Sequence, residues 1–368
     1  MDNWDLFQSN RRIPAKDKII SCYAPFNHIY ITRKGQLSSC CWSTSNQQWL
    51  NGKFSLKDYW FGERSKQNRQ QFFGKQFHKG CENICGNYIK KNIPPPIYDY
   101  DFNVEDERLE HALSDNHYPK VIDFNLSNLC NFACPMCNGE LSSKHMLGRD
   151  KFLKQYVPNM FDDEQNANQL LNEFKEFIPH LTKIRFTGGE PFAHKFLFKF
   201  CDVIAELKPD LPIHITTNGS VFSKKVEKIF TQNNIKLSIS LDTVIEEEYT
   251  KIRIGGNYKD TFSNVKKFKK HIGSKNININ SVFMSVNALN IDKFFKYAYK
   301  NNFKVFINTY DRSGREHTDD WGIDTLSKKQ KKQVYENLLL TKWSFPKNYD
   351  PKEIDKCLKQ IREGYSFY

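Results

Sequence analysis

The sequence lacks a long apolar run and a secretory leader. None of its 368 residues form a stretch that approaches the roughly 20 consecutive apolar residues of a membrane-spanning helix. The chain begins Met1-Asp2-Asn3-Trp4-Asp5, which is not the pattern of a signal peptide. Its 10 cysteines are tightly spaced in a large chain, which argues against a secreted disulfide framework. We therefore expect no membrane partner and a location in the reducing cytoplasm.

An excess of acidic residues is also absent, because the net charge is +13. A basic balance of this size suits an acidic partner such as a nucleic acid, a nucleotide or an acidic peptide, although a general bias toward lysine gives the same charge. The lysine runs at 266–270 and 328–332 have the pattern of solvated helix faces, and no nucleic-acid-binding motif accompanies them. We do not expect a nucleic-acid partner, but the charge leaves that class open.

Apolar residues make up 39% of the chain and support a sizeable core. From Val121 to about Thr309, predicted strands alternate with predicted helices, which is typical of a parallel sheet in an α/β fold. The predicted strands are 121–125, 183–186, 213–216, 236–240, 278–284 and 304–308. The predicted helices are 163–178, 193–207, 223–232, 261–271 and 290–301.

The N-terminal part, residues 1–92, is predicted to be a small cysteine-rich α+β module. It contains an expected hairpin at 28–41 that turns at Lys34-Gly35, and a helical pattern over 54–73 with Ser55 as its N-cap. A proline-rich linker at 93–120 leads to the alternating region, 121–310. Residues 311–368 are predicted to be a helical extension, with helices at 326–340 and 351–364, that caps the open sheet or lines a substrate channel.

Three cysteines directly after the first strand of the alternating region carry the strongest chemical signal. Cys130, Cys134 and Cys137 are separated by three and then two residues, so that a short loop can supply thiolates to three irons of a [4Fe–4S] cluster. No fourth cysteine follows at this spacing, which leaves one iron open to an outside ligand. Zinc is the alternative, but structural zinc sites usually use two separated pairs.

This Cys-x-x-x-Cys-x-x-Cys pattern resembles the signature of the radical S-adenosylmethionine (SAM) enzymes. The resemblance implies a partial (β/α)6 barrel of the TIM type, with the chemistry on the loops that follow the strands. It also implies that the open iron binds SAM and that one electron cleaves SAM to methionine and a 5′-deoxyadenosyl radical.

Further segments resemble the SAM-binding motifs of this family. Gly188-Gly189-Glu190 follows the second strand; the resemblance implies that it holds the amino group of SAM, whereas alone it would be an ordinary loop. Asn218 lies in a segment that resembles one near the same pocket, or forms a simple turn.

The remaining predicted SAM contacts come from the fourth strand, its following segment and the cysteine loop. Ser240, in Ser240-Leu241-Asp242, is expected near the ribose or carboxylate of SAM, and Met136 is expected against adenine. Arg253 is expected to pair with the SAM carboxylate; its alternative is an ordinary surface charge.

Four cysteines of the N-terminal part resemble the twitch module, a shortened SPASM domain that holds an auxiliary [4Fe–4S] cluster. The predicted ligands are Cys22, Cys40, Cys81 and Cys85, with Gly35 placed five residues before Cys40. The segment precedes the barrel rather than following it, and its last pair is Cys-x-x-x-Cys. Cys41 could replace Cys40, and a structural zinc site is the alternative for the whole set. Cys201 and Cys357 lack partners at a suitable spacing and are expected to be buried.

Together these patterns predict a radical SAM enzyme with two [4Fe–4S] clusters and SAM as cofactors. It would abstract hydrogen from a peptide or small-molecule substrate, for which an acidic group would suit the charge, and would use the auxiliary cluster as an electron acceptor or relay in oxidation or cross-linking. An external donor such as flavodoxin or ferredoxin would supply electrons. The alternative is a zinc-binding, non-catalytic nucleic-acid-binding protein, which leaves Gly188-Gly189-Glu190 unexplained.

Overall fold

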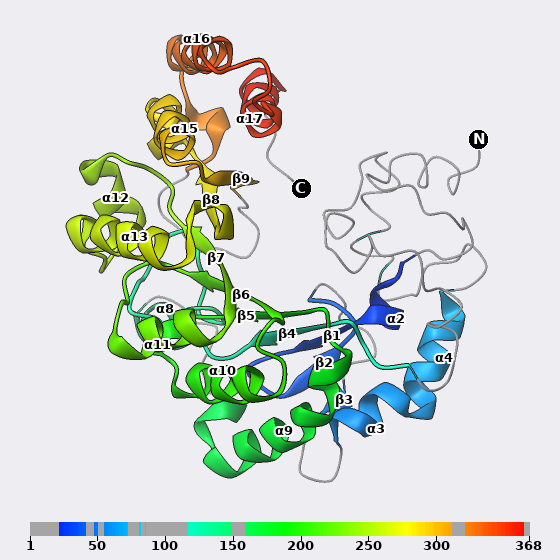
Figure 1. Ribbon diagram of the computed structural model, residues 1–368. Coiled ribbons are helices and arrows are strands. Elements are labelled where there is room, and N and C mark those ends of the chain that lie inside the picture. Colours follow the sequence, from blue (N-terminus) through cyan, green and yellow to red (C-terminus); the bar gives the residue numbers. More distant parts are fainter. Residues whose placement is uncertain are drawn as a thin grey trace. The chain divides into compact units, whose positions relative to one another are not determined.

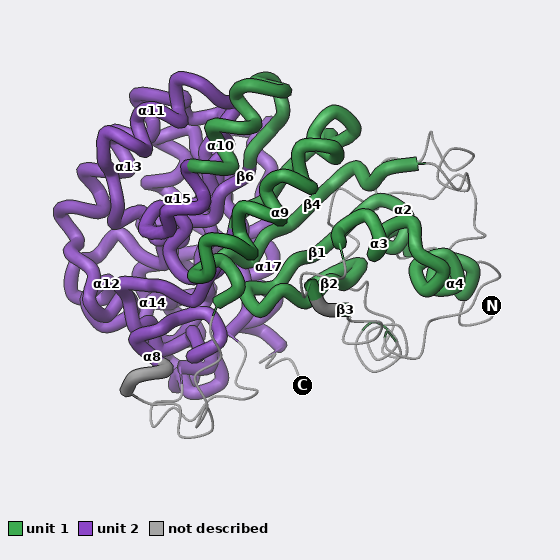
Figure 2. The backbone as a smooth tube through the Cα atoms, turned by 90° about the horizontal axis from the view of Figure 1, so that it is seen from below, with its two compact units in different colours: residues 1–126, 157–186, 199–213 green, residues 127–156, 187–198, 214–368 purple. Residues whose placement is uncertain are grey.

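The structure is a computed structural model that describes residues 22–41, 48–50, 55–72, 81, 85, 117–148, 159–310 and 321–363. The chain forms two compact units, which Figure 2 shows in different colours. Unit 1 comprises residues 1–126, 157–186 and 199–213, and unit 2 comprises residues 127–156, 187–198 and 214–368. The four N-terminal cysteines of the predicted auxiliary site therefore belong to unit 1, and the three-cysteine loop belongs to unit 2.

The described strands form one open sheet in the order β3-β2-β1-β4-β5-β6-β7-β8-β9 (Figure 1). Their bounds are β1 His28–Ile31, β2 Gln36–Ser38, β3 Gln48–Trp49, β4 Val121–Asn125, β5 Lys183–Thr187, β6 Pro212–Thr217, β7 Asn234–Ser240, β8 Ile277–Phe283 and β9 Lys304–Thr309. Parallel ladders join β1 to β4, β7 to β8 and β8 to β9. The α/β fold with an open partial barrel is confirmed, and each of the six predicted strands lies within two residues of its expected ends.

Helices follow most strands. Their bounds are α2 Ala24–Asn27, α3 Leu56–Phe61, α4 Glu63–Gln71, α8 Ser143–Gly148, α9 Glu164–Phe177, α10 Lys195–Leu207, α11 Lys224–Gln232, α12 Glu246–Ile252, α13 Tyr258–Ile272, α14 Ser285–Ala288, α15 Ile291–Lys300, α16 Lys328–Ser344 and α17 Lys352–Glu363. Short 3-10 turns are η4 Met160–Asp162, η5 Ile178–His180, η6 Pro191–Ala193, η7 Ser274–Asn276 and η8 Ile323–Thr325. All five helices predicted in the alternating region are present.

The predicted hairpin is confirmed in unit 1, and it continues the sheet. β1 and β2 pair antiparallel, and β1 also pairs with β4, placing Tyr30 opposite Asp123. The hairpin thus shares main-chain hydrogen bonds with the first strand of the alternating region. Residues 86–116 lie outside the described part of the chain, so the boundaries 1–92, 93–120, 121–310 and 311–368 stay a prediction.

The helical pattern at 54–73 is two helices rather than one. Ser55 caps α3 as predicted: its side chain accepts the Asp58 N–H at 3.0 Å, and Asp58 accepts the Ser55 N–H at 2.9 Å. Gly62 then adopts an extended backbone with ψ 156°, which ends α3 and precedes α4. Sequence periodicity missed this break because α4 contains no apolar residue that would mark a change of phase after Phe61.

Aromatic side chains form the core of unit 1. The buried Phe124 of β4 lies with its ring centroid 5.3 Å from Phe174 of α9, 5.3 Å from Phe186 of β5 and 4.8 Å from Phe200 of α10. Such rings bury a large apolar area, and their edge-to-face contacts add to it. Cys201, beside Phe200 in the chain, is fully buried, as predicted. This packing fixes β4, the strand that leads into the three-cysteine loop.

In unit 2 the C-terminal helix α16 packs against both α15 and α17, and α15 and α17 both contact β9 (Figure 1). One face of α17 hydrogen-bonds to β9: Glu353 accepts the Ile307 N–H at 2.8 Å, Lys356 donates to the Ile307 carbonyl, and Gln360 donates to Thr309 Oγ1 at 2.9 Å. Cys357 is fully buried, as predicted. The helical extension is thus confirmed at 328–344 and 352–363, and a role in a substrate channel stays a prediction.

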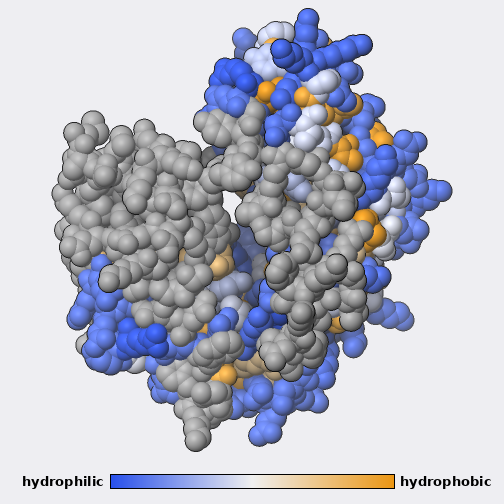
Figure 3. All heavy atoms as spheres, turned by 180° about the vertical axis from the view of Figure 1, so that it is seen from behind, coloured by the Kyte–Doolittle hydropathy of each residue, from blue (hydrophilic) through white to orange (hydrophobic). Residues whose placement is uncertain are grey.

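The described surface in Figure 3 is mainly hydrophilic, with small scattered apolar groups. This distribution agrees with a charge of +13. Among the helices that the structure describes, none is long and apolar enough to cross a membrane.

Candidate cofactor site

The cysteine loop, residues 130–137, follows β4, and backbone hydrogen bonds join it to two other loops of unit 2. Just before the loop, the Leu129 carbonyl accepts the N–H of Glu190 at 2.8 Å. Inside it, Ala133 donates its N–H to the Ile254 carbonyl at 2.9 Å. The segments after β5 and after α12 therefore both position the loop, which lies at the carboxyl end of a strand as barrel enzymes require.

Two side chains that come just after the loop in the sequence make hydrogen-bond contacts with its backbone. Ser142 Oγ donates to the Phe132 carbonyl at 2.7 Å, and His145 Nε2 lies 2.6 Å from the Cys134 carbonyl oxygen. Both polar residues are buried. Because a lost partner would leave a buried polar group unsatisfied, these contacts restrict the loop to one shape.

The sulfur atoms of Cys130 and Cys134 accept hydrogen bonds from N–H groups. Cys130 Sγ accepts from the Phe132 N–H at 3.4 Å and from Asn218 Nδ2 at 3.9 Å, and Cys134 Sγ accepts from Arg253 Nη1 at 3.8 Å. Burial raises the pKa of Cys134 to about 12, which the Arg253 guanidinium only partly opposes, and burial also raises the pKa of Cys130. The free thiols are therefore protonated at neutral pH, whereas a bound metal deprotonates a coordinating thiol.

These donors fit an iron–sulfur cluster, because N–H groups directed at sulfur stabilise thiolates. Among the described residues, no three His, Cys, Asp or Glu side chains converge on a point that could hold a single metal ion. A [4Fe–4S] cluster does not need such convergence, since each iron takes one thiolate from the loop. Cys130, Cys134 and Cys137 are the residues that could hold it.

The Gly188-Gly189-Glu190 turn packs directly against the cysteine loop. Gly188 and Gly189 have φ of 87° and 53°, and a Cβ at Gly189 would lie 2.2 Å from the Leu129 carbonyl oxygen. No residue with a side chain fits there without moving one of the two loops. The glycine thus allows the close approach on which the Leu129–Glu190 hydrogen bond depends.

Glu190 is fully buried at the centre of a hydrogen-bond network. Its carboxylate accepts from the N–H of Asn218 at 2.7 Å, the N–H of Phe192 at 3.1 Å and the hydroxyl of Thr217 at 2.8 Å. Burial raises the pKa of Glu190 to about 7, and these hydrogen bonds only partly oppose that effect. The predicted residues Glu190 and Asn218 therefore lie together, and Asn218 also donates to Asn131 Oδ1 of the cysteine loop at 2.9 Å.

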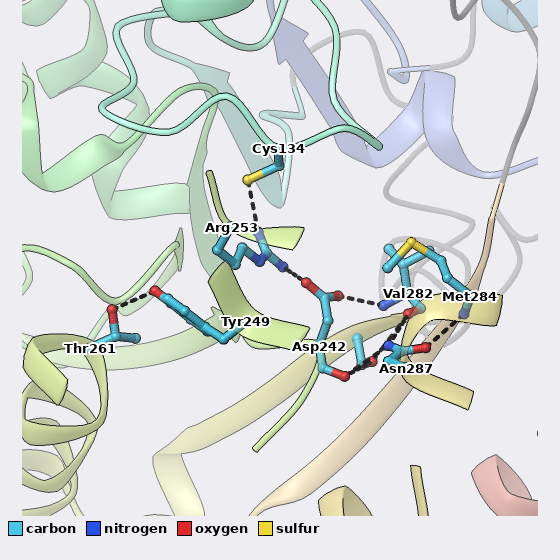
Figure 4. A network of polar contacts seen from close by, with 9 residues as sticks. Cys134, Asp242, Tyr249, Arg253, Thr261, Val282, Met284 and Asn287 are labelled. Carbon is cyan, nitrogen blue, oxygen red and sulfur yellow. Dashed lines mark hydrogen bonds and ion pairs between the residues drawn. The ribbon is translucent and has the colours of Figure 1, made fainter. Parts of the chain in front are cut away.

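Arg253 is buried, so its interpretation as an ordinary surface charge is wrong. Its Nη2 lies 2.6 Å from Asp242 Oδ2, and Figure 4 shows Arg253 between Asp242 and Cys134. Burial opposes the charge on Arg253, but Asp242 outweighs this and raises the pKa of the guanidinium above its usual value. Arg253 is therefore a cation in the folded protein.

Two other predicted SAM contacts lie near this pair. Ser240 is the last residue of β7, two positions before Asp242, and Met136 packs beside a buried cluster of Ile252, Met284 and Tyr310. Roles for Gly188, Gly189, Glu190, Asn218, Ser240, Arg253 and Met136 in binding SAM stay predictions.

Three residues of these networks, Thr217, Asp242 and Asn131, have no predicted role from the sequence. The sequence carried a signal for two of them, because both lie in segments that resemble family motifs: Thr217 is the last residue of β6, and Asp242 lies two residues after the end of β7. Asn131 lies within the cysteine loop itself and gives no separate signal.

The N-terminal cysteines cluster within unit 1. Cys22 and Cys81 pack against Tyr23, Phe26 and Phe72. Burial raises the pKa of Cys81 to about 12, with a further contribution from Cys22. Burial also raises the pKa of Cys85, with contributions from Cys22, Cys81 and Cys41.

Cys40 differs from Cys41 in its surroundings. Cys40 is buried, and burial together with a smaller contribution from Cys40 raises the pKa of Tyr59. Cys41 is exposed and makes a small contribution to the pKa of Cys85, which burial raises. Electrostatic contributions therefore link Cys85 to Cys22, Cys81 and Cys41, and the choice of Cys40 or Cys41 as the fourth ligand stays a prediction.

Comparison with known proteins identifies the class. The model of the radical SAM superfamily matches residues 124–308, about half of the chain, which includes the cysteine loop, Glu190 and Arg253. The chain belongs to the radical SAM superfamily. Membership implies SAM and a [4Fe–4S] cluster, which the donor set of the cysteine loop fits.

Several curated relatives are GTP 3′,8-cyclases. The chain is 24% identical to the one from Campylobacter lari over 258 residues, which is 68% of this chain and 72% of the relative. It is 28% identical over 174 residues to molybdenum cofactor biosynthesis protein 1 of Dictyostelium discoideum, covering 45% of this chain and 25% of that relative.

Matches among solved structures include anSMEcpe with bound AdoMet and SuiB of Streptococcus suis. The first shares 18% identity with a TM-score of 0.45, and the match covers 60% of this chain and 59% of that one. SuiB shares 15% identity with a TM-score of 0.43, and the match covers 85% of this chain and 68% of that one.

Proposed function

We propose that this protein is a radical SAM enzyme that reductively cleaves SAM and abstracts hydrogen from a peptide or small-molecule substrate. Cys130, Cys134 and Cys137 would hold the cluster, which when bound would supply the one-electron chemistry that generates a hydrogen-abstracting radical from SAM. The observation that carries the proposal is the cysteine loop, which offers three thiols and is fixed by the Glu190 and Ile254 segments of the same unit.

The chain's own residues would bind and orient SAM. Glu190 offers a buried carboxylate for the amino group, and its hydrogen bonds to Asn218 and Phe192 keep it in place. The Thr217 hydroxyl donates to the same carboxylate and limits its rotation. Burial excludes water from this end of the site, which strengthens the interaction with an ammonium group.

The test compares the native protein with a variant in which Cys130, Cys134 and Cys137 are all alanine, after anaerobic reconstitution. The native protein should show the visible absorption of an iron–sulfur cluster and cleave SAM when dithionite supplies electrons. The variant should lose that iron and the cleavage. Cys357→Ala is the matched control, because it removes a buried thiol that lies outside the site. Continued cleavage by the triple variant would refute the assignment.

We also propose that Cys22, Cys81 and Cys85, with Cys41 or Cys40, hold an auxiliary [4Fe–4S] cluster that accepts or relays electrons. Their clustering in unit 1 supports this proposal. Four thiolates would saturate the irons, so this site would transfer electrons rather than bind substrate. Replacing Cys81 and Cys85 with serine should remove about half of the iron while SAM cleavage continues; retained zinc with full substrate turnover would instead indicate a structural zinc site.

A nucleotide is the small-molecule candidate that one observation favours. Relatives of the chain are named GTP 3′,8-cyclases, and a charge of +13 suits a polyanion. Reconstituted protein incubated with GTP, SAM and a reduced flavodoxin should then form a new nucleotide product, detected by mass spectrometry. Unchanged GTP in a preparation that cleaves SAM would exclude GTP and leave a peptide or another small molecule as the substrate.

A further inference from the structure

A buried ion pair extends to one of the three sulfur atoms of the cysteine loop. Arg253 donates from Nη1 to Cys134 Sγ at 3.8 Å, and its Nη2 lies 2.6 Å from Asp242 Oδ2. The side chain of Asp242 has no exposed surface and that of Arg253 is 10% exposed. The guanidinium therefore joins a carboxylate and a thiol in the interior of unit 2 (Figure 4).

Asp242 is itself fixed by the segment that includes the end of β8 and α14. Its Oδ1 accepts the Val282 N–H at 2.8 Å, and its carbonyl accepts from Asn287 Nδ2 at 2.9 Å. Asn287 is held in turn, because it accepts the Met284 N–H at 2.9 Å and donates to the Val282 carbonyl at 2.9 Å. Main-chain groups thus hold the Asp242 carboxylate, which in turn positions the guanidinium.

The energetics of such a pair point away from a purely stabilising role. Desolvation of two buried charges commonly offsets their attraction, so that apolar residues of the same volume would stabilise a fold equally well. The donors to Cys130 are neutral groups, the Phe132 N–H and the Asn218 amide. Cys134, by contrast, accepts from the charged guanidinium of Arg253.

We propose that Arg253 is a positioning residue for the cluster: aimed by Asp242, it donates an N–H···S hydrogen bond to the Cys134 thiolate and raises the reduction potential of the SAM-binding cluster. Reduction adds negative charge to a cluster, and a nearby cation with a hydrogen bond to sulfur stabilises that state. This inference rests on the proposed function, since it requires the cluster at Cys134. It assigns Arg253 an effect that exists before SAM binds, which contact with the SAM carboxylate would not produce.

The experiment is an anaerobic redox titration of the full-length reconstituted protein, followed by electron paramagnetic resonance without SAM. The signal of the relevant cluster is the one that changes when SAM is added afterwards, because SAM binds the open iron. Arg253→Gln should shift the midpoint potential of this signal to a more negative value. Tyr249→Phe is the matched control: it removes the 2.7 Å hydrogen bond to Thr261 from the neighbouring helix α12 without changing a charge or a sulfur contact, and should leave the potential unchanged.

A second pair of variants tests the role of Asp242. Asp242→Asn should change the potential when Arg253 is present and have little effect when Arg253 is already glutamine, because Asp242 acts through the guanidinium. Equal effects in both backgrounds would show that Asp242 acts independently and would contradict the proposal. If the Arg253→Gln protein does not hold iron, the Arg253→Lys protein is used for the same test. The compact ammonium of lysine cannot bridge Asp242 and Cys134, so this variant should also have a lower midpoint potential.

The outcomes separate the two proposals. An intact cluster whose potential is the same in the native protein and the Arg253 variants, even with weaker SAM binding, overturns this inference alone. A native protein that takes up no iron–sulfur cluster overturns the proposed function and this inference with it.

Discussion

Replacing Glu190 with glutamine should change how the stability of the protein depends on pH. Glu190 has a pKa of about 7 in the folded protein instead of the usual 4.5, because it is buried. Between these values the folded state holds a proton that the unfolded state has released, so native stability falls as the pH rises from 4.5 to 7 and is constant above. A shift of about 2.5 pKa units corresponds to about 3 kcal/mol.

Glutamine cannot ionise and removes this dependence. The free energy of unfolding of Glu190→Gln, relative to that of the native protein, should therefore increase by about 3 kcal/mol across this pH range. Urea unfolding of both proteins without cofactors, at several pH values, measures the difference, and all other titrating groups cancel in it. A difference that stays constant with pH would refute the reasoning, whatever its absolute size.

Glu190→Gln should also weaken SAM binding, because it removes one charge-assisted contact. A loss of about 1.5–3 kcal/mol corresponds to roughly ten- to a hundredfold in Kd. Native affinity should itself fall as the pH drops below about 7, where Glu190 becomes protonated. Equal SAM affinity in the native protein and the variant at pH 8, measured by equilibrium dialysis, would exclude Glu190 from the SAM site.

Three further results are expected. Gly189→Ala should lower the free energy of unfolding by more than Gly273→Ala. Alanine at either position would be strained by on the order of 1–3 kcal/mol because φ is positive, but at Gly189 its Cβ would also lie 2.2 Å from a backbone oxygen. Equal losses in urea unfolding would contradict the close approach of the loops. Asp123→Asn should cost on the order of 3 kcal/mol, since it breaks a buried 3.1 Å contact to a histidine. Burial opposes the charge on Asp123, but His28 and Arg185 outweigh it and lower the pKa of this carboxylate. The cost of the substitution should therefore shrink in acid below pH 3.8, where Asp123 becomes protonated; a cost independent of pH would show that the charge on Asp123 does not contribute. Cys41→Ser should reduce iron content more than Cys40→Ser, because Cys41 lies within electrostatic range of Cys85; the reverse order in iron assays would identify Cys40 as the ligand.

The sequence predicted local features well because they depend on neighbours in the chain. The alternation of apolar residues located β4 to β9, and the spacing of Cys130, Cys134 and Cys137 located the candidate site. Position after a strand also indicated Glu190, since loops at the carboxyl ends of parallel strands meet on one side.

Features that depend on pairing across the fold were less accessible. The Asp242–Arg253 contact depends on the short helix α12 and on the Val282 N–H of another strand, so no spacing in the sequence encodes it. The parallel pairing of β1 with β4 joins segments about 90 residues apart, for which the chain carries no local signal. The difference in burial between Cys40 and Cys41 likewise depends on how the end of the hairpin packs in the fold.

The contacts between α17 and β9 restrict where a peptide could be recognised. An extended guest peptide often binds by adding itself as a further strand to a sheet, and it needs free main-chain groups to do so. At Ile307 both of these groups are already engaged, the N–H by Glu353 and the carbonyl by Lys356. Strand addition at this position, whether by a substrate or by a second copy of the chain, would first have to displace α17. The same helix therefore also protects β9 from the edge-to-edge aggregation to which unpaired strands are prone.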